Sequence, residues 1–113
     1  WQAAVPNHEL YKFYCAADVA VWPRGASISQ REAMACGLPL IISEHSMVTD
    51  LVSYENGFVM KEGQASHLAG QMKKLLEPVL RQRMGSNSRK VVEEHLNWRT
   101  IAKQFIDIVN KPD

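Results

Sequence analysis

The sequence contains few of the features that would identify a class of function directly. Its 113 residues include two cysteines, and its 13 basic residues outnumber the 12 acidic ones by a single charge. This near-neutral balance argues against a nucleic acid or an anionic membrane as a partner recognised by charge, because such binding is driven by clustered basic residues. No apolar run approaches the roughly 20 residues that a membrane-spanning helix needs.

The common catalytic motifs are also absent. The sequence contains no Walker A motif, no G-x-G-x-x-G and no G-x-S-x-G, and its four histidines lack a metal-ligand spacing such as H-E-x-x-H. We therefore expect no metal cofactor. Cys15 and Cys36 are expected to be small buried side chains in a reducing, cytoplasmic compartment rather than a disulfide. The sequence shows no signal-peptide pattern. Because the chain begins without Met, we expect a piece of a longer protein.

What the sequence does contain is centred on residues 27–39, which predict a helix with a clear end. Gly37 is suited to the left-handed residue that follows a helix, and Pro39 prevents continuation. Apolar runs at 19–22 and 40–42 flank this helix, and their unbroken hydrophobicity is typical of strands buried on both faces. Strand, helix and strand in this order predict a βαβ unit of a parallel sheet.

The rest of the chain alternates in the same way. Further predicted elements are a helix at about 8–16, a strand at 58–60, a helix capped by Ser66, helical pieces at 79–84 and 86–95 separated by Gly85, and a last helix capped by Asn97. Strands alternating with helices indicate an α/β fold in one domain, residues 1–113. The last helix carries an apolar stripe: Trp98, Ile101, Ala102, Phe105 and Val109. We expect this stripe to pack in the core, with docking to a missing neighbour as the alternative.

Glu32 and the loop before it are the candidate functional residues. Glu32 could close a Ser29-x-x-Glu32 capping box, or it could accept hydrogen bonds from the two vicinal hydroxyls of a ribose. The residues alone favour the cap. Arg24 and Gly25 could cradle a phosphate, since Gly25 lets a ligand approach the backbone and Arg24 supplies charge. A plain strand-to-helix turn explains this loop equally well.

Five segments, taken in order, carry a resemblance to a known family. Residues 10–19 nearly match its pattern L-x-x-Y-Y-x-x-A-D-V, and residues 32–41 nearly match its signature E-A-M-A-C-G-x-P-V-I. Its x-N-G-x-L-V turn is similar to residues 55–59, and its L-R-x-x-M-G and F-S-W landmarks to residues 80–85 and 96–98. The chain thereby resembles the C-terminal nucleotide-sugar domain of group 1 (family 4) glycosyltransferases of the GT-B fold.

The resemblance implies a partial Rossmann-like parallel sheet with flanking helices, the C-terminal half-domain of a GT-B fold. It further implies a retaining transferase that moves a sugar from a nucleotide-sugar co-substrate to an acceptor without a metal. Glu32 would bind the donor ribose, and the turn from Val5 to Asn7 would flank the base. The backbone of the loop before the helix would lie by the donor sugar and diphosphate: Gly25, Ala26, Ser27 and Ile28.

Arg24 departs from the family pattern. The family usually places a second glutamate eight residues before the one matched by Glu32, where this chain has Arg24. That glutamate normally contacts the donor sugar, so Arg24 suggests a different sugar or a contact to phosphate, and it is the one candidate catalytic residue. The same substitution keeps open the alternative of a non-enzymatic α/β binding module.

The resemblance covers the second part of the C-terminal domain of such an enzyme. The acceptor, a glycan, lipid or small molecule, would bind through a missing N-terminal domain, which could also hold the protein at a membrane surface. We therefore expect little or no turnover from the isolated chain. Two strands of the usual sheet would be missing beside residues 19–22, and the chain is expected to self-associate through the open edge.

Overall fold

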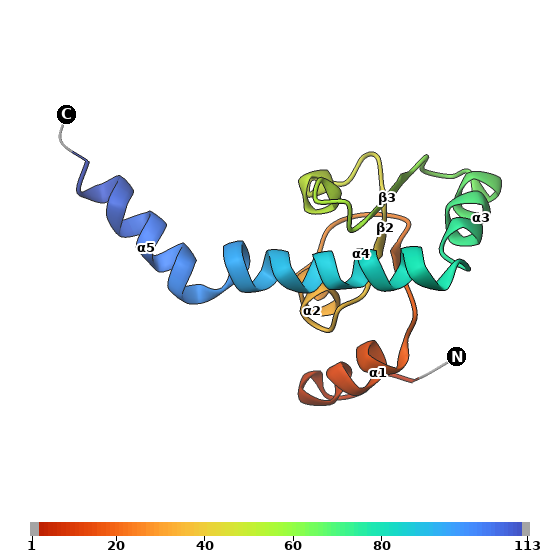
Figure 1. Ribbon diagram of the computed structural model, residues 1–113, viewed down its shortest axis with the longest axis horizontal. Coiled ribbons are helices and arrows are strands. Elements are labelled where there is room, and N and C mark those ends of the chain that lie inside the picture. Colours follow the sequence, from red (N-terminus) through yellow and green to blue (C-terminus); the bar gives the residue numbers. More distant parts are fainter. Residues whose placement is uncertain (1–2, 112–113) are drawn as a thin grey trace.

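The computed structural model describes residues 3–111 and contains a parallel three-stranded sheet. Its strands are β1 (Ala20–Trp22), β2 (Leu40–Ser43) and β3 (Gly57–Met60), in the order β1-β2-β3. Figure 1 labels β2 and β3. Ala20 pairs with Leu40, and Leu40 pairs with Gly57. The predicted strands and the α/β fold with a parallel sheet are confirmed.

Helices surround this sheet. They are α1 (Leu10–Ala16), α2 (Ser29–Ala35), α3 (Ala65–Lys74), α4 (Pro78–Val91) and α5 (Trp98–Val109), with 3-10 turns η1 (Asn7–Glu9) and η2 (Thr49–Val52) and a π-helical segment η3 (Val92–Leu96). None of the helices described within residues 3–111 has the length and apolar character needed to cross a membrane.

Strand β2 is buried on both faces and separates two apolar clusters. Leu40 and Ile42 join one cluster, which α2 completes through Ala33 and Met34. Ile41 points to the opposite face, because side chains alternate along a strand, and it joins the second cluster. That second cluster also holds Met60, Leu75 and Met84. Burial on both sides explains the unbroken apolar run of β2.

The end of α2 follows its sequence signal closely. Gly37 has a φ of +77°, in the left-handed region where glycine is favoured. The Gly37 N–H donates to Met34 O at 2.9 Å and the Leu38 N–H donates to Ala33 O at 3.1 Å. These two bonds form a Schellman motif, which satisfies the last carbonyls of the helix and turns the chain into β2.

The prediction that Gly85 separates two helical pieces is wrong. Helix α4 continues through Gly85 and leads directly into η3. The reason is packing: a Cβ added to Gly85 would lie 2.2 Å from Gly37 O, so a side chain would collide with the end of α2. Glycine is therefore present to allow close approach of α4 to α2, which outweighs its poor helix propensity.

Helix α5 projects from the sheet and contacts η3 (Figure 1). Asn97 caps it as predicted, because its Oδ1 accepts a hydrogen bond from Thr100 N at 2.9 Å. The expected core packing of its stripe is wrong, since no residue of α5 is buried and Trp98 is 85% exposed. An amphipathic period shows which face is apolar, but it does not show what covers that face.

Two smaller predictions are also wrong. Ser66 does not cap α3, because the helix begins at Ala65 and Gln64 occupies the N-cap position. Cys15 is exposed on α1, while Cys36 is half-buried at the end of α2. Both cysteines are free thiols. Helix α1 contains no buried residue, so its cysteine is not drawn into the core.

Candidate functional site

The carboxyl ends of the three strands meet at one edge of the sheet because all three are parallel. The loop of residues 23–28 follows β1, the loop of residues 44–48 follows β2, and Glu62 lies two residues beyond β3. Ligands of open parallel sheets bind outside this edge. The predicted loop residues therefore lie at the edge where a ligand is expected.

The amino end of α2 is organised by Gln30, not by Glu32. Ile28 occupies the N-cap position without a side-chain cap, and Ser27 N donates to Gln30 Oε1 at 3.1 Å. The predicted capping box of Ser29 and Glu32 is therefore wrong. Gln30 is fully buried, and its Nε2 has no hydrogen-bond partner within the described residues. The Glu32 carboxylate therefore does not cap α2 and can bind another group.

Glu32 instead faces α1. The Tyr14 hydroxyl donates a hydrogen bond to Glu32 Oε2 at 3.4 Å. Both side chains line a cavity of about 230 Å³ between α1 and α2, together with Asn7, Leu10, Tyr11, Ala35 and Cys36. The structure thus brings Asn7 and Glu32 to one cavity. Val5 is half-buried and does not belong to this lining.

The ionisable groups around Glu32 are held in their neutral forms. Burial raises the pKa of Tyr14, and the nearby Glu32 carboxylate raises it further, because both disfavour a phenolate. Burial also raises the pKa of the Cys36 thiol, with neighbouring Cys15 adding to the effect. Tyr14 is therefore a hydrogen-bond donor at neutral pH, and Cys36 is not an activated nucleophile.

Arg24 points to a different group of residues. Its Nε lies 3.3 Å from Glu62 Oε1, and the other Glu62 oxygen accepts a hydrogen bond from the Ser43 hydroxyl at 2.7 Å. Ser43 is fully buried at the end of β2, whereas the Arg24 side chain is 81% exposed. No described contact joins Arg24 to Glu32. The guanidinium is thus anchored at one nitrogen and open to solvent over the rest of its surface.

Sequence reasoning missed Glu62 and Ser43. Both are polar residues at or just after the ends of predicted strands, and this position was the available signal. Glu62 lies two residues beyond the predicted strand at 58–60. Because side chains from neighbouring parallel strands converge at the carboxyl edge, such residues can be grouped once the strand order is known.

The loop between Arg24 and α2 is exposed to solvent. Gly25 has a φ of +67°, and its carbonyl accepts a hydrogen bond from the Ser46 hydroxyl at 3.1 Å. Ala26, Ser27 and Ile28 are exposed, and the Ser27 and Ser29 hydroxyls form a short hydrogen bond. The loop is thereby tied to the segment that follows β2 while its outer surface stays open.

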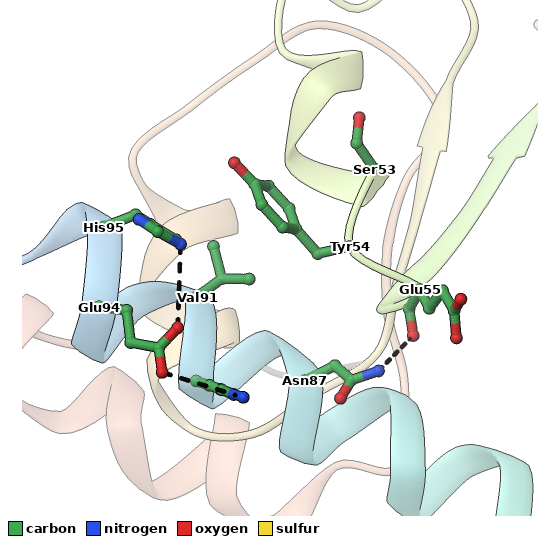
Figure 2. A pocket seen from close by; sticks show the side chains of 8 residues that line it. Ser53, Tyr54, Glu55, Asn87, Val91, Glu94 and His95 are labelled. Carbon is green, nitrogen blue, oxygen red and sulfur yellow. Dashed lines mark hydrogen bonds and ion pairs between the residues drawn. The ribbon is translucent and has the colours of Figure 1, made fainter.

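A second cavity lies near the start of β3 and contains none of the predicted residues. It has a volume of about 350 Å³ and is bounded by residues 53–55 on one side and by α4 and η3 on the other. The rings of Tyr54 and His95 stack there with centroids 5.9 Å apart. Figure 2 shows the side chains that line this cavity from close by. Glu94 Oε2 lies 3.8 Å from His95 Nε2, and Glu94 Oε1 lies 3.9 Å from Lys90 Nζ.

Among residues 3–111, no group of three or more His, Cys, Asp or Glu side chains could hold a metal ion.

Residues 1–91 match the model of the family described as glycosyl transferases group 1. The chain belongs to this family. It is 27% identical over 122 residues to the amylovoran biosynthesis glycosyltransferase AmsK of Erwinia amylovora, a match that covers 94% of this chain and 29% of that protein. It is 25% identical to the MMP alpha-(1->4)-mannosyltransferase of Mycolicibacterium hassiacum, covering 96% of this chain and 28% of the relative.

A solved structure shares the fold of this glycosyltransferase chain. The sucrose-phosphate synthase of Thermosynechococcus elongatus superposes with a TM-score of 0.84 and is 29% identical, over 96% of this chain and 28% of that one. The group 1 family and the α/β fold expected from the sequence are therefore confirmed. The chain spans less than a third of the length of each relative named here.

Proposed function

We propose that this chain is the donor-binding part of a retaining glycosyltransferase that uses a nucleotide-sugar, with Glu32 as the ribose ligand. The proposal rests on one observation: Glu32 does not cap α2, and it lines the α1–α2 cavity together with Asn7. A carboxylate there can accept hydrogen bonds from both vicinal hydroxyls of a ribose. Val5 and Asn7 would flank the base of the nucleotide.

The loop after β1 would bind the diphosphate and the sugar. Gly25, Ala26, Ser27 and Ile28 are exposed there, and Arg24 adds a cationic side chain at the same edge. During transfer the bond between the anomeric carbon and the diphosphate oxygen breaks, and negative charge builds on the leaving group. Backbone N–H groups and a guanidinium stabilise such charge, so the reaction as proposed needs no metal.

The acceptor site and the rest of the activity would lie in parts of a longer protein. The match covers 28% to 29% of the relatives named above, and we expect the isolated 113-residue chain to show little or no turnover. The acceptor would be a glycan, a lipid or a small molecule, and the protein would act in the cytoplasm or at the membrane surface.

Calorimetry on the full-length protein tests the role of Glu32. We expect Glu32→Ala to weaken binding of UDP-, GDP- or ADP-sugars by about tenfold or more, because hydrogen bonds to a charged group are lost. Glu93→Ala is the control, since Glu93 is an exposed carboxylate on η3 that pairs with Arg89. Equal affinity of the wild type and Glu32→Ala would remove Glu32 from the site.

A non-enzymatic binding module is the second candidate. Arg24 favours this candidate for two reasons. The family usually has a glutamate at this position, and the Arg24 side chain already forms an ion pair with Glu62. Release or transfer of a sugar by the full-length protein would exclude this alternative. Absence of nucleotide binding by the full-length protein would favour it.

A further inference from the structure

Tyr14 joins α1 to Glu32 on α2. Its hydroxyl donates a hydrogen bond to Glu32 Oε2 at 3.4 Å. Both side chains line the α1–α2 cavity. Among residues 3–111, this is the one side-chain hydrogen bond that holds the Glu32 carboxylate.

We propose that Tyr14 is a positioning residue that orients the Glu32 carboxylate for the vicinal hydroxyls of a ribose. This inference rests on the proposed function of Glu32. A glutamate side chain has three rotatable bonds, and its terminal torsion is broad and poorly defined on its own. One donor fixed at Oε2 defines the plane of the carboxylate and leaves the remaining lone pairs free for a ligand.

Tyr14 is suited to this task by its surroundings. Its ring packs against the apolar cluster that contains Met34 and Leu40, while its hydroxyl reaches the α1–α2 cavity. A ring supported on one side loses little further freedom when its hydroxyl forms a hydrogen bond. Because the pKa of Tyr14 is raised, its hydroxyl is protonated at neutral pH and can donate to the carboxylate.

Tyr54 offers a matched control. It lies outside the α1–α2 cavity, its ring stacks on His95, and its hydroxyl has no hydrogen bond within the described residues. Phenylalanine at either position removes one hydroxyl and keeps the ring. A general effect of losing a tyrosine hydroxyl would appear in both variants, whereas loss of carboxylate orientation appears only at Tyr14.

The experiment measures nucleotide binding to the full-length protein by calorimetry. The ligands are UDP, ADP and GDP, each compared with its 2′,3′-dideoxy counterpart, which lacks the hydroxyls that Glu32 would bind. We expect Tyr14→Phe to weaken the best-bound diphosphate by about threefold to tenfold, the loss typical of one hydrogen bond, and to leave its dideoxy form unchanged. Tyr54→Phe should change neither affinity.

A double-mutant cycle separates this inference from the proposed function. In a Glu32→Ala background, Tyr14→Phe should have no further effect, because there is no carboxylate to orient. If Glu32→Ala weakens the ribonucleotide but Tyr14→Phe does not, the inference is overturned and the role of Glu32 stands. Equal losses for the ribose and dideoxy ligands in Tyr14→Phe would also overturn it. If Glu32→Ala has no effect and the two ligand forms bind alike, the proposed function itself fails.

Discussion

The contact between Gly85 and Gly37 leads to a specific prediction for Gly85→Ala. A new Cβ would lie 2.2 Å from the Gly37 oxygen and 3.2 Å from the Gly37 carbonyl carbon. Gly37 cannot easily yield, because the Schellman motif and its φ of +77° define the turn into β2. The added methyl group must therefore push α4 away from α2.

The expected cost follows from two opposing effects. Overpacking costs about 1–3 kcal/mol, and contact with a constrained backbone atom places this case near the upper end. Alanine is favoured over glycine within a helix by about 1 kcal/mol, which offsets part of that cost. We therefore expect Gly85→Ala to lower the free energy of unfolding by about 2 kcal/mol.

Urea unfolding followed by circular dichroism measures this change. The matched control is Gly70→Ala in α3, where an added Cβ has no neighbour within 4 Å. That variant should gain about 0.5–1 kcal/mol, since only the helix preference remains. If Gly85→Ala is as stable as the wild type, or if both variants shift in the same direction, the close approach of α4 to α2 is not what requires glycine.

Three further predictions concern the cap of α4, a buried amide and the open surfaces. Glu77→Gln should lower the melting temperature at pH 7, and the difference in melting temperature from the wild type should vanish as the pH falls below 4.5. Hydrogen bonds from the N–H groups of Leu80 and Val79 lower the pKa of Glu77. The ionised cap therefore stabilises the fold above the ordinary carboxyl pKa, and this stabilisation is lost on acidification. Asn56→Ala should cost about 1–3 kcal/mol in urea unfolding, because fully buried Asn56 donates to Leu51 O at 2.8 Å and that carbonyl would lose its partner. The 113-residue chain should self-associate through the outer edge of β1 and the apolar stripe of α5, and a monodisperse monomer in light scattering at high concentration would contradict this.

The strands and α2 could be predicted from the sequence because their signals are local. A buried parallel strand needs a short apolar run, and the end of α2 needs Gly37 followed by Pro39. The role of Gly85 could not be predicted from its neighbours in the sequence. A glycine that ends a helix and a glycine that admits another backbone look alike along the chain, and its contact at Gly37 is 48 positions away.

The candidate site was predictable in its location but not in its contacts. The S-x-x-E/Q pattern occurs twice, as Ser27 with Gln30 and as Ser29 with Glu32, and only the path of the loop decides between them. The pairing of Arg24 with Glu62 depends on the strand order, which brings the ends of β1 and β3 to one edge. The donor-binding roles of these residues remain predictions.

The junction at η3 determines the direction in which α5 projects. The helix contains 12 residues and is therefore about 18 Å long, and it meets the rest of the chain at η3. A change of about 20° at the junction would move the far end by about 6 Å, while the sheet and the α1–α2 cavity kept their internal contacts. The direction of α5 can thus respond to whatever covers its apolar stripe without any repacking of the core.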